Sequence, residues 1–179
     1  MQMRPEIQIA TMITAMTDVI MPAIDPKNRL ANEQSQLVVG MLHLMEKQLP
    51  LQFRFDRDEL QRLIKAAGDI DTICGEESAR SEALKSLSDA RAAATETLEK
   101  CQVEPASIVE FIRALRSGIG LVLTDIGERG TVGHLEATEA VVLKMSREQF
   151  LRDRALLVPQ NWETDPASLP SIETLLSTV

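Results

Sequence analysis

Apolar residues recur at intervals of three and four near the start of the chain, which is the spacing of a helix with a buried face. Residues 5–24 hold six such positions, Ile9, Met12, Ile13, Met16, Val19 and Ile20. Between Ile7 and Ile24 the only ionisable side chain is that of Asp18. We therefore expect residues 5–24 to form the central helix of the fold, enclosed by later helices of the chain or by a second copy of it.

A proline and an asparagine mark the boundary between this helix and the next. Pro22 interrupts the hydrogen-bond ladder of a helix, and Pro26 disfavours a helical conformation at Asp25. The first helix should therefore end at Met21 or Ile24. Asn28 is a suitable N-cap for a second helix that reaches Leu49. The two helices are expected to form a hairpin.

The pattern then predicts an extended linker and a third helix. Residues 51–55 alternate apolar and polar side chains, which favours an extended segment that places a phenylalanine in the core. A capping-box signal at Asp56 marks the start of the third helix. Its end is expected at one of two glycines, Gly68 or Gly75.

Four further helices are predicted in the second half of the chain. Ser78 can cap the fourth, and Pro105 stands at a favourable first-turn position of the fifth. The fifth helix carries a single apolar stripe, formed by Ile108, Ile112, Leu115, Ile119, Val122 and Ile126. Thr131 can cap a sixth helix, and a second capping box at Ser146 predicts a seventh that runs to about Val158.

Composition agrees with a helical fold. The chain has four Phe, one Trp and no Tyr, whereas strong helix formers are abundant. We expect an all-α protein, an antiparallel helical bundle of four to five long helices with shorter C-terminal helices. Residues 1–158 are assigned to the bundle, and residues 159–179 to a loosely docked tail with a short helix. Trp162 in this tail is a candidate anchor, either for a partner chain or for the bundle itself.

Charge and cysteine content limit the possible partners and the expected cellular location. The net charge of −8 argues against nucleic-acid binding, because acidic surfaces repel a phosphate backbone. A membrane span over residues 5–24 is rejected, since three threonines and Asp18 would lie in hydrocarbon. Two cysteines with no metal or redox spacing indicate a reducing, cytoplasmic location.

The clearest candidate for a binding site is a group of methionines around one histidine. The predicted ligand-binding residues on the first two helices are Met12, Met16, Met41, His43 and Met45. Methionines paired at four-residue spacing can line an adaptable apolar pocket, and an imidazole inside an apolar helix can act as a base or ligand. The simpler alternative is core packing around a histidine at the edge of the core.

A second candidate is the glycine-rich turn between the fifth and sixth helices. Arg129, Thr131 and His134 could bind an anion there, at the amide-rich start of a helix. The simpler alternative is a helix cap followed by a turn. The spacings typical of metal sites are absent, so neither a metal nor another cofactor is expected.

A family resemblance is carried by the first two predicted helices. The matching positions are Met21-Pro22-Ala23-Ile24 at the end of the first helix, followed by Asn32, Leu37 and Glu46. With these, residues 9–49 resemble the start of a family of small helical bacterial proteins of unknown function. Members tend to be encoded beside phosphotransferase-like and acyl-CoA-dehydrogenase-like enzymes, so the resemblance implies an accessory role.

Apolar helix surface without a polar constellation for catalysis favours a protein that works by contact. We expect a non-enzymatic helical bundle that acts as a homo-oligomer or as the accessory subunit of a metabolic enzyme. The alternative is a protein or enzyme that binds a small apolar, acyl-type ligand in a pocket of the first hairpin near His43.

Overall fold

A computed structural model of the chain describes residues 4–75, 81–161 and 163–177. Within these ranges every regular element is a helix and no strand occurs, which confirms the prediction of an all-α fold. Two compact units are present, residues 1–52 with 153–172 and residues 53–152 with 173–179. The predicted domain boundary at residue 158 stays a prediction. The roles predicted for Ser78 and Trp162 concern positions outside the described residues.

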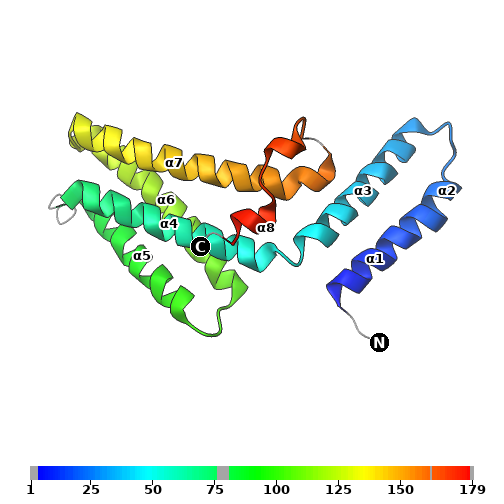
Figure 1. Ribbon diagram of the computed structural model, residues 1–179, viewed down its shortest axis with the longest axis horizontal. Coiled ribbons are helices and arrows are strands. Elements are labelled where there is room, and N and C mark those ends of the chain that lie inside the picture. Colours follow the sequence, from blue (N-terminus) through cyan, green and yellow to red (C-terminus); the bar gives the residue numbers. More distant parts are fainter. Residues whose placement is uncertain (1–3, 76–80, 162, 178–179) are drawn as a thin grey trace. The chain divides into compact units, whose positions relative to one another are not determined.

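The first unit is built on a helical hairpin (Figure 1). Its elements are α1 (Pro5–Ala15), the π-helical turn η1 (Met16–Ile20), α2 (Met21–Ala23) and α3 (Arg29–Gln48). In η1 the backbone amide of Met21 donates to the carbonyl of Met16, five residues back. Pro22 accounts for this wider turn, because it lacks an amide hydrogen and its ring clashes with the carbonyl four residues earlier. The helix ends at Ala23 with Ile24 as its C-cap, within one residue of the later of the two predicted ends.

Asn28 caps α3, as its position in the sequence predicts. Its side-chain oxygen accepts a hydrogen bond from the amide of Ala31 at 3.1 Å. Asn32 reinforces the same corner, because its side-chain amide donates to the carbonyls of Asp25 and Asn28. These bonds hold the connection between α2 and α3 in one conformation.

The expectation that later helices of the chain enclose residues 5–24 is wrong. Of α1 only Ile9 is buried, whereas Met12 is 45% and Ile20 is 47% exposed. Within its unit α1 packs mainly against α3, which covers one side of it. The long helices after residue 52 bury their own apolar faces in the other unit instead.

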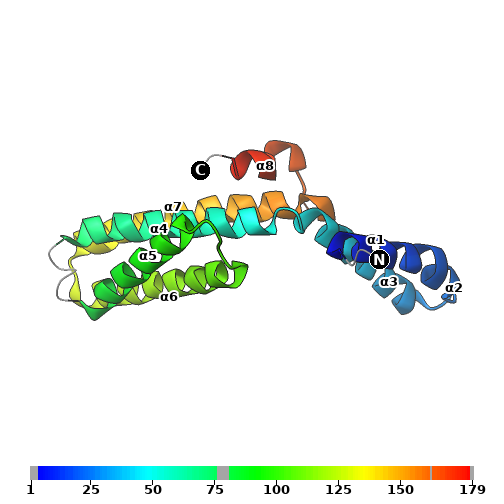
Figure 2. The same ribbon diagram turned by 90° about the horizontal axis from the view of Figure 1, so that it is seen from below.

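The second unit contains the main apolar core. Its helices are α4 (Gln52–Cys74), α5 (Glu82–Glu99), α6 (Pro105–Arg129), α7 (Val132–Leu157) as far as Arg152, and the short α8 (Ile172–Leu175) from Glu173 on. Two of these, α5 and α6, lie side by side in both views of the ribbon (Figures 1 and 2). All six positions of the stripe predicted for the fifth helix are buried on α6, and Pro105 stands at the start of that helix. Both predictions are confirmed.

The extended linker predicted at residues 51–55 is wrong. Helix α4 begins at Gln52, so Asp56 lies inside the helix and does not start it. Phe55 is 7% exposed and Leu63 is 2% exposed. Eight residues are close to two helical turns, so a helix places both side chains on the same buried face. Of the two predicted helix ends, the one at Gly75 is closer, since α4 ends at Cys74.

The predicted break at Ser146 is also wrong, because α7 continues through it from Val132 to Leu157. Contacts with the rest of the unit exist on both sides of this serine. Met145 packs against the core, and Gln149 accepts a hydrogen bond from Arg62 of α4 at 2.7 Å. A continuous helix keeps both contacts, whereas a serine in a helix interior costs only a few tenths of a kcal/mol, up to about 0.7.

Candidate functional site

A cleft of about 700 Å³ lies on α3 in the first unit. One wall is formed by residues of α3, namely Glu33, Gln36, Leu37, Gly40, Met41 and His43. The other wall is residues 159–161, which follow the end of α7. Pockets that bind small molecules have volumes of roughly 300–1,000 Å³, so the size of this cleft suits such a ligand.

The second wall is shaped by a proline and an asparagine. α7 gives way at Leu157 to the 3₁₀ turn η3 (Val158–Gln160), in which Pro159 cannot continue the hydrogen-bond ladder of the helix. Asn161 follows with φ of 58°, in the left-handed region that asparagine tolerates better than most residues. The turn thereby lies against α3.

Gln160 and Met41 join the two walls of the cleft. The side-chain amide nitrogen of Gln160 donates to the Met41 sulfur across 3.7 Å. The Gln160 Oε1 atom is buried, and it has no hydrogen-bond partner among the residues that the structure describes. A buried acceptor without a partner costs free energy, so this oxygen is a locally unfavourable feature of the turn.

Gly40 leaves part of the α3 wall without a side chain. A Cβ atom built at Gly40 would meet no atom within 4 Å. His43 has a side chain that is 55% exposed, and its Nδ1 lies 3.7 Å from Glu46 Oε2. The cleft therefore has unfilled volume beside Gly40 and an accessible imidazole at its edge.

An ion pair holds the segment after the turn against α7. Arg154 donates to Glu163 through Nε and Nη2, each across 2.8 Å. These hydrogen bonds are the main reason that the pKa of the Glu163 carboxyl is lowered, and the guanidinium charge adds to the effect. For the same reason the pKa of Arg154 is raised. The bidentate pair restricts the chain on either side of residues 159–161.

The cleft includes two of the five residues predicted to bind a ligand, Met41 and His43. The other three, Met12, Met16 and Met45, are not among the residues that line it. Ligand binding by any of the five stays a prediction. Sequence reasoning did not identify Gln160 as a site residue, because no local motif connects it with Met41, 119 positions away along the chain.

The residues predicted to bind an anion lie at the junction of α6 and α7. Arg129 ends α6 and forms an ion pair with Asp125, one turn earlier. Thr131 caps α7 as predicted, since its hydroxyl accepts from the amide of His134 at 3.2 Å. Anion binding at Arg129, Thr131 and His134 stays a prediction.

No family model matches the chain, and neither a curated protein nor a solved structure is significantly similar to it. The family resemblance of residues 9–49 thus stays an expectation. In the part of the chain that the structure describes, no helix has the length and apolar character that crossing a membrane requires. Over the same residues, no three His, Cys, Asp or Glu side chains are grouped as a metal site would need.

Proposed function

We propose that this chain acts through protein–protein contact and that two copies associate through the α1–α3 hairpin. The observation that carries the proposal is the distribution of exposed apolar side chains. Among the described residues sixteen large apolar side chains are at least 40% exposed, and ten of them belong to the hairpin. These ten are Ile7, Met12, Val19, Ile20, Leu30, Leu37, Val38, Met41, Met45 and Leu49. Exposed apolar residues that gather on one element are typical of a contact surface.

The polar groups of α1 and η1 are compatible with burial in such an interface. Thr11, Thr14 and Thr17 donate their hydroxyl hydrogens to backbone carbonyls four residues earlier, over 2.8–3.1 Å. A hydroxyl that already has a partner loses little when water is removed from it. Burial of this segment would therefore leave few hydrogen-bond donors without a partner.

Charge favours a second copy as the partner. Residues 1–52 carry four basic and five acidic side chains, a net charge of −1, whereas the whole chain carries −8. Two copies that meet through the hairpin would bring together parts that are nearly neutral, and electrostatic repulsion would be small. A membrane surface is a poor partner for the helix, since residues 5–24 contain no Lys or Arg to bind anionic lipids.

The proposed contact face of α3 is separate from the cleft. Val38, Met45 and Leu49 are seven and four residues apart, so they follow one line along the helix. The cleft wall follows a different line, with Gly40 and His43 three residues apart. Leu37 and Met41 lie between the two lines. Substitutions at Val38 and Met45 can thus test association without altering the cleft wall.

Sedimentation equilibrium tests the proposal over a range of protein concentrations. We expect the wild-type chain to have twice the mass of a single copy. The double variant Val38→Glu, Met45→Glu should dissociate at least about a hundredfold more readily, because it places four charges in the apolar contact of the dimer.

The matched control is Leu121→Glu with Leu143→Glu in the second unit. Those leucines are 61% and 56% exposed, against 46% for Val38 and 49% for Met45, so the control adds the same charge at somewhat more exposed positions outside the hairpin. It should leave the dimer intact. A wild-type chain that is monomeric throughout, or a dimer that the control dissociates equally, would overturn the proposal. The role of accessory subunit to a metabolic enzyme stays a prediction.

A further inference from the structure

We infer that Met41 and Met45 on α3 are oxidation sites, and that a peroxide which converts them to methionine sulfoxide dissociates the two copies. The inference rests on the proposed association through the hairpin. It adds a chemical modification that regulates the same surface.

Methionines are concentrated in the hairpin. Of the eight methionines in the chain, seven lie within residues 1–45, and Met145 is the only one beyond them. Met41 and Met45 are 50% and 49% exposed, whereas Met145 is partly buried and packs against the core of the second unit. A single copy of the chain therefore presents the side chains of Met41 and Met45 to a reagent in water.

The two methionines lie together on the proposed contact face of α3. They are four residues apart, so successive turns of the helix place them on the same side. Met45 follows the line of Val38 and Leu49, and Met41 lies beside that line. Because Val38 and Leu49 are also exposed, a second copy that covers them would cover both methionines.

Oxidation would change the polarity of this face. The thioether sulfur attacks one oxygen of hydrogen peroxide, so that an S–O bond forms and the O–O bond breaks. The other oxygen leaves as hydroxide and takes up a proton to give water, while the sulfur is oxidised and the peroxide is reduced. The product is a methionine sulfoxide, in which a flexible apolar side chain has become polar.

A sulfoxide on α3 would weaken the association. Its oxygen is a hydrogen-bond acceptor that loses its water when a second copy binds, and the side chains of Val38 and Leu49 have no donor to replace that water. Burial of a polar group without a partner costs enough to make the copies dissociate at least about tenfold more readily. Association should in turn slow the oxidation, because a second copy covers the sulfur atoms.

Peroxide treatment followed by sedimentation equilibrium tests the inference, and mass spectrometry of peptides locates the added oxygen. We expect sulfoxide at Met41 and Met45 before Met145, and dissociation at least about tenfold more readily than before treatment. A dimer that stays intact with both residues oxidised would overturn this inference alone. A chain that is monomeric before treatment would overturn the proposed association, and this inference with it.

Two variants locate the effect. Met41→Leu with Met45→Leu keeps an apolar face of similar volume, so this double variant should form the dimer and keep it after peroxide treatment. Met145→Leu is the matched control and should dissociate on oxidation as the wild type does. Cys74 and Cys101 are free in all these proteins, so their oxidation cannot explain a difference. Equal dissociation of the oxidised double variant and the oxidised wild type would show that the sites are wrong.

Two further readouts separate this effect from general damage to the protein. Methionine sulfoxide reductases for both sulfoxide epimers should restore the wild-type dimer. If the sulfoxides disappeared and the dimer did not return, the inference would fail. The rate of oxidation at Met45 should also fall as the protein concentration rises, in step with the fraction of single copies. A rate that is independent of concentration across the association range would contradict burial of Met45 in the dimer.

Discussion

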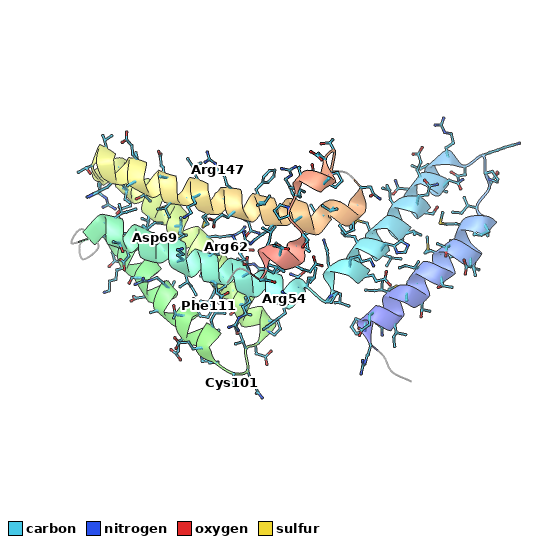
Figure 3. The ribbon with its side chains drawn as sticks, in the orientation of Figure 1. Arg54, Arg62, Asp69, Cys101, Phe111 and Arg147 are labelled. Carbon is cyan, nitrogen blue, oxygen red and sulfur yellow. The ribbon has the colours of Figure 1, made fainter. Side chains whose placement is uncertain are left out.

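Asp58 on α4 and Arg152 on α7 form a buried ion pair, in which Arg152 Nε lies 2.8 Å from Asp58 Oδ2. The two side chains are 3% and 10% exposed. The same carboxylate accepts a hydrogen bond from Arg62 Nε at 2.8 Å, and the Arg62 side chain extends from α4 towards α7, where it donates to Gln149 (Figure 3). Arg152 also donates to the carbonyl of Leu175 at 3.2 Å. One carboxylate thus helps to join α4, α7 and the C-terminal segment of the second unit.

Removal of the Asp58 charge should strongly destabilise the second unit. In Asp58→Asn two guanidinium groups remain buried without their carboxylate, and a buried charge that loses its partner costs about 3–5 kcal/mol. Urea unfolding followed by circular dichroism measures the loss. The control is Glu96→Gln, which breaks the exposed pair with Lys100, where the side chains are 75% and 56% exposed. That change should cost about 0.5 kcal/mol or less, and a similar loss in both variants would contradict the assignment.

Replacement of a core threonine should stabilise the protein. Thr138 on α7 is 0% exposed, and its hydroxyl has no hydrogen-bond partner among the described residues. Thr138→Val keeps the shape of the side chain and removes the unpaired hydroxyl, so the free energy of unfolding should rise by about 1 kcal/mol. Thr97→Val is the control, because the Thr97 hydroxyl donates to the carbonyl of Ala93 at 2.9 Å. It should show no such gain; a gain in Thr97→Val equal to that of Thr138→Val would argue against the explanation.

The sequence predicts a helix well where its own pattern determines which face is buried. On α6 a single apolar stripe faces the core, so every predicted core position from Ile108 to Ile126 is buried. On α1 the same kind of pattern indicates only that the apolar face should be buried against some other segment. It does not say which segment supplies it, and Met12 lies exposed. The local capping signal at Ser146 led to a wrong prediction of a helix start there, because contacts on both sides of this serine favour a continuous helix.

The cleft could be predicted only in part, for a related reason. Met41 and His43 stand out as a methionine and a histidine in an apolar helix, and both line it. Gln160 and Asn161 reach the cleft through tertiary contacts of η3 with α3, which no periodicity reveals. Pro159 indicates that the helix ends there, but it does not indicate where the following residues lie.

Substitution of two glycines on α6 should have opposite effects. A Cβ atom at Gly118 would lie 3.1 Å from Leu87 Cδ1 on α5, whereas one at Gly120 would meet nothing within 4 Å. Gly118→Leu therefore forces carbon atoms into a filled contact and should cost about 1–3 kcal/mol. Gly120→Leu replaces an exposed glycine with a good helix former and should gain up to about 1 kcal/mol. Thermal unfolding of both variants checks this prediction, and equal shifts of the midpoint would refute the close approach of α5 and α6.

The Arg154–Glu163 pair should make the order of the turn after α7 depend on pH. Because hydrogen bonds from Arg154 lower the pKa of Glu163 below its ordinary value of 4.5, the pair contributes fully above that value. Its contribution should disappear as the pH falls through the lowered pKa, when the carboxylate takes up a proton. The chemical shift of the Glu163 carboxyl carbon, followed from pH 7 to pH 2, gives the titration midpoint.

In Arg154→Gln the guanidinium charge and the bidentate hydrogen bonds are lost, so the titration midpoint of Glu163 should rise towards the ordinary value. The same variant should show faster amide hydrogen exchange at Gln160 and Asn161 at pH 7, because the segment that follows them is released. In the wild-type protein, protection of these two amides should fall to the level of the variant only at acid pH. This comparison is made after correction for the intrinsic pH dependence of exchange. A Glu163 midpoint that is the same with and without Arg154 would show that the hydrogen bonds between the two side chains do not set the pKa of Glu163.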